Sequence, residues 1–250
     1  MKLKLKKIMM TIASAMTAAT MMLATMPAAQ VSAATITNDQ SKIAMYSRED
    51  NWVYHASQQF TNYIRVDKNL SCGKVYLYTK DYNDAWKKEE ASFVSSLDDK
   101  YDIYAATSGL MGRNPECYAV CEAAGNTYID NNSGKYYTYQ NLGAAPLCVL
   151  RNHSYMPDDH YDVNVNLKNI AYQKDVRVRY TLDNWKTYKE ASLSYKKTLQ
   201  DGTELWNTTI DTSAATQDSF HFAVSYTVNG QTYWDNNFNR NYDFSFHNQY

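Results

Sequence analysis

The chain has 250 residues, with 25 lysines and arginines against 26 aspartates and glutamates and a formal net charge of −1. No basic run follows Lys7, so nucleic acid is not an expected partner. The unusual residue is tyrosine: 23 tyrosines accompany 5 tryptophans and 7 phenylalanines, a composition that favours strands and amphipathic contact surfaces.

Residues 1–33 have the pattern of an export signal. Lysines gather in Lys2–Lys7, Ile8–Met26 is apolar and small, and Val31-Ser32-Ala33 offers small residues for cleavage before Ala34. A membrane anchor is the alternative, although Thr and Ser dilute the apolar stretch. We therefore expect a secreted, extracellular protein that has no contact with the membrane once the signal peptide is removed.

Short alternating segments dominate the rest of the chain. Examples are Lys74–Tyr78, Asp175–Tyr180 and Phe220–Tyr226, in which apolar and polar residues alternate with the period of a strand. Long amphipathic helices are hard to find. The sequence therefore predicts an all-β protein.

The chain repeats itself once, in collinear order. Segments of the first half recur in the second: Tyr78-Thr79 as Tyr180-Thr181, Trp86-Lys87 as Trp185-Lys186, Glu90-Ala91-Ser92 as Glu190-Ala191-Ser192, Tyr118-Ala119-Val120 as Phe222-Ala223-Val224, and Gly125–Asn132 as Gly230–Asn237. A repeat of about a hundred residues is a whole domain and not a solenoid unit. With a connector near residues 141–146, we predict two tandem β-sandwich domains, residues 34–145 and 146–250.

One stretch, Gly230–Tyr242, combines aromatic and amide side chains. It starts at the hairpin turn Asn229-Gly230, continues with Tyr233-Trp234, and ends in a loop rich in asparagine. A flat aromatic ring suits the apolar face of a pyranose, and amides both donate to and accept from its hydroxyls. The alternative is a capped hairpin whose tryptophan belongs to the core.

Most of residues 150–246 resembles the family-21 carbohydrate-binding modules. The segments that carry this resemblance are Lys168–Lys174, Val176–Tyr180, Asp183-Asn184-Trp185, Phe222–Tyr226, Asn229–Asn237 and Asn241-Tyr242. Members include the starch-binding domain of fungal glucoamylases and modules of glycogen-targeting phosphatase 1 subunits. The resemblance implies immunoglobulin-like sandwiches and α-glucan ligands.

The resemblance also implies which residues bind carbohydrate. Trp185 and Trp234 would be the platforms, and Tyr172 would serve a second site, whereas Ala223 stands where some members have another aromatic. The polar and neighbouring positions are Asn169, Lys174, Glu204, Tyr233, Asp235, Asn236, Asn237 and Asn241. Plain structural roles remain open: Trp185 as a core residue, Lys174 as a solvated charge, and Asp235 as a partner of its own loop.

The first half keeps part of this pattern. Its candidate carbohydrate-binding residues are Asn69, Lys74, Trp86, Tyr128 and Asn131. Three replacements weaken the match: Ile129 for the platform tryptophan, Cys72 for Tyr172, and Tyr136 at the position of Asn241.

The four cysteines are Cys72, Cys117, Cys121 and Cys148, which allow three pairings. Cys117 and Cys121 are four residues apart on a predicted strand, beyond disulfide reach, so they should not pair with each other. The other choices stay open. The cysteines are too dispersed for a zinc site, and we expect neither a metal nor a cofactor.

Catalysis is not expected. The five histidines show no metal-binding spacing, and the chain has no nucleophile-elbow motif and no recognisable carboxylate pair beyond the sandwich pattern. We expect a secreted, non-catalytic protein that binds α-glucans (starch, glycogen, malto-oligosaccharides) by aromatic stacking plus Asn and Lys hydrogen bonds. An amylolytic enzyme or a cell surface is a candidate partner. The alternative is an extracellular protein-interaction or adhesion module that uses the Tyr- and Trp-rich surface.

Overall fold

A computed structural model describes residues 35–53, 57–108, 116–138, 141–150, 159–216 and 218–243, without the side chains of 50–53 and 57–59. The expected signal peptide, residues 1–33, lies outside these ranges. Residues from Thr35 to Tyr250 belong to one compact unit. The described part of the chain has no helix with the length and hydropathy of a membrane span.

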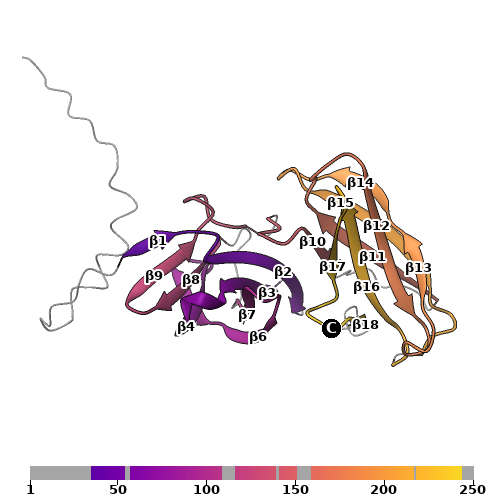
Figure 1. Ribbon diagram of the computed structural model, residues 1–250, viewed down its shortest axis with the longest axis horizontal. Helices are drawn as coiled ribbons and strands as arrows, with labels where there is room; N and C mark the ends of the chain where they lie inside the picture. The colour runs from indigo at the N-terminus through magenta and orange to yellow at the C-terminus, as the bar shows by residue number, and fades with distance from the viewer. Residues whose placement is uncertain are drawn as a thin grey trace, which may run out of the picture. The chain divides into compact units, whose positions relative to one another are not determined.

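The first half forms two sheets (Figure 1). One has the strand order β2-β3-β7-β6: β2 (Ile43–Val53), β3 (Ser57–Asp67), β7 (Tyr101–Thr107) and β6 (Ser92–Ser96). The other has the order β1-β9-β8-β4-β5: β1 (Ile36–Asn38), β9 (Asn126–Asp130), β8 (Cys117–Ala123), β4 (Lys74–Lys80) and β5 (Trp86–Glu90). Only the pairing of β1 with β9 is parallel among the described strands. A 3₁₀ turn, η1 (Lys68–Leu70), follows β3.

The second half also forms two sheets, with matching strand orders. One is β10-β11-β15-β14: β10 (Leu147–Leu150), β11 (His160–Leu167), β15 (Glu204–Asp211) and β14 (Ser194–Thr198). The other is β13-β12-β16-β17, with β18 beside β16: β13 (Lys189–Ser192), β12 (Lys174–Thr181), β16 (His221–Val228), β17 (Gln231–Asp235) and β18 (Tyr242–Asp243). The prediction of an all-β protein is confirmed.

Each half has its own buried core, and each core takes residues from both sheets of that half. The largest fully buried side chains of the second core include Tyr161, Phe220 and Tyr226. These aromatic residues account for part of the unusual tyrosine content, because a buried tyrosine supplies a large apolar area to a thin sandwich. The tyrosines therefore fill cores as well as surfaces.

Fine irregularities recur in both halves. A bulge interrupts the pairing of β6 with β7 at Phe93, and another interrupts the pairing of β14 with β15 at Tyr195. The ring of Phe93 lies edge-on to Tyr104 at 5.8 Å, and that of Tyr195 lies edge-on to Trp206 at 6.1 Å. The two bulges lie on strands that hold the same position in the two sheet orders.

The strand register corrects the alignment of the two halves at β4 and β12. The Ala91 N–H donates to the Val75 carbonyl, and the Leu193 N–H donates to the Val176 carbonyl, both at 2.8 Å. Val75 therefore corresponds to Val176, and Ala91 corresponds to Leu193. The sequence repeat matches Ala91 to Ala191, which is two residues earlier.

This shift separates two lysines that the sequence pattern equates. Lys74 precedes Val75 by one residue and is exposed, with its Nζ 3.1 Å from Glu90. Lys174 stands two residues before Val176, and its side chain is buried. A slip of one residue moves a side chain to the other face of a sheet, so Lys74 and Lys174 are not equivalent.

The cysteines divide into one disulfide and two thiols. Cys72 and Cys121 are bonded, with their Cα atoms 6.1 Å apart. Cys117 and Cys148 are buried free thiols, so Cys117 and Cys121 do not pair with each other, as expected. Burial raises the pKa of the Cys117 thiol. The Cys148 thiol donates to the Arg48 carbonyl at 3.3 Å and forms no cross-link to the described residues of the first half.

Candidate functional site

Both predicted platform tryptophans are exposed. Trp185 retains 38% of its accessible surface and Trp234 retains 45%. Trp234 is on β17 and pairs with Ser225 of β16, whereas Trp185 lies in the loop that follows β12. The alternative reading, in which Trp185 is a core residue, is wrong.

The loop of Trp185 holds a large side chain in an unusual backbone conformation. Asn184 and Trp185 have φ values of 57° and 64°, in the left-handed region that bulky residues avoid. The Trp185 N–H donates to the Thr181 hydroxyl at 2.9 Å, and the Asp183 carboxylate accepts from the N–H and the hydroxyl of Thr187 at 2.9 and 2.8 Å. The surrounding hydrogen bonds therefore stabilise a conformation that keeps the indole at the surface.

Asp183 is the anchor of this loop. The Thr187 N–H, then the Thr187 and Thr181 hydroxyls, lower its pKa to about 2. Each of these donors favours the ionised carboxylate. The hydrogen bonds that hold this loop are therefore stronger when Asp183 is ionised.

An arginine lies between two aromatic rings on the outer face of this sheet. The Arg179 guanidinium carbon is 5.0 Å from the Trp234 ring centroid and 4.9 Å from that of Tyr188. Glu190 accepts from Arg179 Nε at 2.9 Å and lies 2.7 Å from its Nη2. Arg179 pairs directly with Ala223, whose small side chain leaves room for the guanidinium.

Trp234, Arg179 and Tyr188 thus form a row of flat groups across the sheet, which we call the outer plate. Guanidinium and indole attract each other through the ring quadrupole. Sequence reasoning missed Arg179 and Tyr188, because only the pairing of β12 with β13 and β16 brings them beside Trp234. At Ala223, where some members of the family have another aromatic, Arg179 of the neighbouring strand is the direct pairing partner.

Three predicted polar contacts bind one another. Lys174 Nζ donates to Asn169 Oδ1 at 2.7 Å and to Glu204 Oε2 at 2.8 Å, and Trp206 Nε1 donates to the same Glu204 oxygen at 2.8 Å. The side chains of Lys174 and Glu204 are only 3% and 9% exposed. Lys174 is therefore not a solvated charge, and a buried ion pair of this kind needs both partners. Nearby, Tyr172 is 98% exposed, as a second contact position requires.

The segment 235–241, which we call the asparagine loop, is held by its own side chains. Asn237 Nδ2 donates to the Asn241 carbonyl at 3.1 Å, and Asn236 Nδ2 donates to Asn239 Oδ1 at 3.0 Å. Four of its residues have positive φ: Asn237, Phe238, Asn239 and Asn241. Asparagine tolerates this conformation, which explains why the loop is rich in it.

Two predicted contact residues of this stretch face inward. Asp235 accepts from the Val149 N–H at 2.8 Å and from the Tyr242 hydroxyl at 2.7 Å, so it stabilises the loop. Burial raises its pKa. Tyr233 is half-buried and packs against the second core. Neither side chain lies on the outer plate.

Trp86 is the first-half tryptophan whose side chain the structure describes, and it is less exposed than Trp185 and Trp234. Trp86 is half-buried between the rings of Tyr118 and Tyr136, each 4.9 Å away. The next residue, Lys87, pairs with Thr79 of β4, and Lys189 pairs with Tyr180 at the same place on β12. The residue before each lysine is therefore equivalent, so Trp86 corresponds to Tyr188 and not to Trp185.

The other first-half candidates are dispersed. Tyr128 packs against the first core, and Asn131 accepts from Asn38 Nδ2 at 2.7 Å. Asn69 is exposed within η1, and Lys74 forms its ion pair with Glu90. These residues do not gather into one surface.

Histidine, cysteine, aspartate and glutamate side chains form no group of three able to ligate a metal within the described ranges. The chemistry that the second half offers is therefore that of flat apolar surface, amides and hydroxyls.

Known proteins share part of this chain. It is 35% identical over 82 residues to protein phosphatase 1 regulatory subunit 3C of Bos taurus, which covers 31% of this chain and 26% of the relative. It is 32% identical over 114 residues to subunit 3B of Homo sapiens, or 44% of this chain and 40% of the relative. The chain therefore spans well under half the length of these relatives.

A solved structure of the starch-binding domain of Rhizopus oryzae glucoamylase, with beta-cyclodextrin and maltoheptaose, is also similar. The identity is 25%, the TM-score is 0.32, and the match covers 40% of this chain and 92% of that domain.

These relatives correct the function expected from the sequence. The interpretation as a secreted protein without a phosphatase role is wrong, and the extracellular adhesion alternative is wrong with it, because the curated relatives are regulatory subunits of a phosphatase. The carbohydrate-binding part of the interpretation is not overturned.

A family model locates the similarity within the chain. The model for the carbohydrate/starch-binding module (family 21) matches residues 147–245, the half that carries Trp185, Trp234 and the asparagine loop. The second half of this chain is thus similar to family-21 starch-binding modules.

Proposed function

We propose that this chain is a non-catalytic regulatory subunit that binds glycogen- or starch-like α-glucan and brings a phosphatase partner to the polymer. The observation that carries the glucan part is the exposure of Trp185 and Trp234 within the residues that match the starch-binding family model. The phosphatase part rests on the names of the curated relatives.

The energetics suit a polymer ligand. Covering one indole with a glucose ring contributes about 1–2 kcal/mol, and each net hydrogen bond adds about 0.5–1.5 kcal/mol. After the cost of association, a single site reaches a Kd of roughly 10⁻³ to 10⁻⁵ M. Such a site is weak for a free sugar, yet a polymer presents many copies of its epitope.

We propose further that residues 34–145 and 146–250 are two tandem copies of one immunoglobulin-like sandwich. Matching sheet orders, matching bulges and the two edge-on ring pairs support this proposal. Trp86 is half-buried and the other described candidates of the first copy are dispersed, so these residues would not form an equal site.

The glucan part is tested by affinity electrophoresis of the full chain in native gels cast with glycogen. We expect retardation by glycogen, and a loss of about 1–3 kcal/mol of binding free energy in Trp185→Ala and in Trp234→Ala. Tyr82→Ala is the matched control, because Tyr82 is an exposed aromatic outside the site. Unretarded migration of the wild-type chain would overturn the proposal.

The phosphatase part needs a separate measurement. Glycogen-coated beads are incubated with purified protein phosphatase 1 catalytic subunit, with and without the chain. We expect the catalytic subunit to be retained only when the chain is present. Retention of the chain without the phosphatase would leave a glucan-binding protein and exclude the regulatory role.

A further inference from the structure

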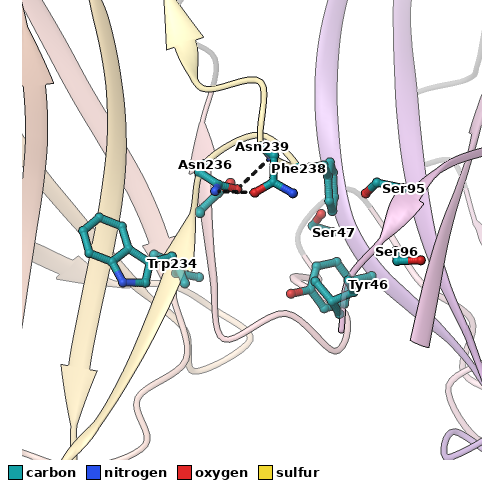
Figure 2. A pocket seen from close by; sticks show the side chains of 11 residues that line it. Tyr46, Ser47, Ser95, Ser96, Trp234, Asn236, Phe238 and Asn239 are labelled. Carbon is teal, nitrogen blue, oxygen red and sulfur yellow. Dashed lines mark hydrogen bonds between the residues drawn. The ribbon is translucent and has the colours of Figure 1, made fainter. Parts of the chain in front are cut away.

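A cavity of about 190 Å³ lies beside the asparagine loop (Figure 2). Trp234, Asn236 and Asn239 line it from the second half. Four hydroxyl side chains line it from the first half: Tyr46, Ser47, Ser95 and Ser96. This volume is below that of pockets for drug-sized ligands, so it suits one small polar unit.

An aromatic contact seats the asparagine loop against the first half. The ring centroid of Phe238 is 4.5 Å from that of Tyr63 and 6.2 Å from that of Tyr46. Arg240 Nη2 adds a contact of 3.5 Å to the Tyr63 hydroxyl. Phe238 holds a φ of 53°, whereas Ser133, in the matching place of the first half, has no ring to make such a contact. The cavity therefore has two walls joined by a packed aromatic group.

The hydroxyls of the first-half wall are not all satisfied. Ser95 Oγ is buried and has no hydrogen-bond partner in the described part of the chain. Burial, with a smaller effect from Asp235, raises the pKa of Tyr46 to about 12, so its phenol keeps its proton. A buried hydroxyl without a partner costs free energy, and a bound molecule or water has to supply the missing bond.

The second-half wall offers amides and no available charge. Asn236 and Asn239 bond to each other, with Asn236 Nδ2 donating to Asn239 Oδ1. Asp235 lines the cavity as well, but its carboxylate accepts from Val149, Asn237 and Tyr242. A charged ligand would find no opposite charge here, whereas a neutral polyhydroxyl ligand can donate and accept at every wall.

We infer that this cavity binds one glucosyl unit of the same α-glucan chain that lies on Trp234. Trp234 lines the cavity and is also exposed, so the outer plate and the cavity share this residue. The first half then supplies the second wall of a shared site. This inference rests on the glucan binding proposed above.

The test is isothermal titration calorimetry of the full chain with maltoheptaose. Ser95→Ala removes one oxygen, and Ser47→Leu fills the cavity. We expect Ser95→Ala to raise the Kd about 2- to 12-fold, the effect of one net hydrogen bond, and Ser47→Leu to raise it further. The matched control is Ser92→Ala, an exposed serine on the same strand as Ser95, which should leave the Kd unchanged.

The outcomes separate this inference from the proposed function. Wild-type binding that both cavity variants retain in full would overturn the inference and leave the glucan-binding proposal intact. No binding by the wild type would overturn both. Equal weakening by Ser92→Ala would also overturn the inference, because the effect would not be specific to the cavity.

A second measurement does not depend on affinity. The thiol introduced by Ser47→Cys is labelled with a thiol reagent, and we expect maltoheptaose to slow labelling, because the sugar covers this wall. The native free cysteines, Cys117 and Cys148, are buried. Labelling at an unchanged rate under saturating maltoheptaose would contradict the inference. Thermal unfolding verifies that each variant is folded. If Ser47→Leu does not fold, the Kd of Ser95→Ala alone tests the inference.

Discussion

Asp130 and Asp235 occupy the same place in the two halves of the chain. The Asp130 carboxylate accepts from the Met45 N–H and the Tyr137 hydroxyl, both at 2.8 Å. The Asp235 carboxylate accepts from the Val149 N–H at 2.8 Å and the Tyr242 hydroxyl at 2.7 Å. Each aspartate is the last residue of its strand, β9 or β17, and its carboxylate bonds to the backbone of a strand in the facing sheet, β2 or β10.

Loss of Asp235 should destabilise the second half. Asp235→Ala leaves a buried N–H and a buried hydroxyl without their acceptor, and we expect the free energy of unfolding to fall by about 3 kcal/mol. Urea unfolding measures this loss. Asp218→Ala, at an exposed aspartate, is the control. A loss no larger than that of the control would show that the carboxylate is dispensable.

The outer plate predicts unequal roles for two neighbouring arginines. Arg179 contacts Trp234 and Tyr188, whereas Arg177 is paired with Asp175 and lies on the same strand with the same charge. We expect Arg179→Ala to weaken glycogen binding by about 0.5–1 kcal/mol, because it removes a flat group and the support of both rings. Arg177→Ala should have no such effect, and equal weakening by both variants would indicate a simple charge effect. Affinity electrophoresis distinguishes these results.

The Trp185 loop should depend on pH through Asp183. Its pKa is about 2 in the folded chain, below the value of about 3.9 for an unperturbed aspartate. A lowered folded pKa means that the stabilisation is present above about pH 4 and is lost as the pH falls toward 2. We expect wild type to exceed Asp183→Asn in stability near neutral pH, with the difference shrinking below pH 4. A difference that stays constant down to pH 2 would contradict this assignment.

The disulfide between Cys72 and Cys121 should stabilise the first half. It joins residues with a sequence separation of 49, for which loop-closure entropy gives about 4 kcal/mol. We expect Cys72→Ser to lower the free energy of unfolding by about 2–4 kcal/mol. A reductant should produce the same loss in wild type and none in the variant. If the reductant destabilises both chains equally, the cross-link is not the cause.

The all-β class, the repeat and the exposed indoles followed from local patterns. Alternation with period two marks strands wherever one face is buried, and the turn residues Asp183 and Asn229 place Trp185 and Trp234 next to loops. These signals are carried by residues close together in the chain, so the printed sequence suffices to read them.

The partners of individual side chains could not be read in this way. Lys174 binds Glu204, Arg179 lies beside Trp234, and the Asp235 side chain faces inward. Each of these contacts depends on which strands pair and in what register. A slip of one residue exchanges the two faces of a strand. Lys74 and Lys174 lie in similar sequence contexts, yet Lys74 is exposed and Lys174 is buried. Register is set by contacts between segments far apart in the chain, and only the folded molecule contains them.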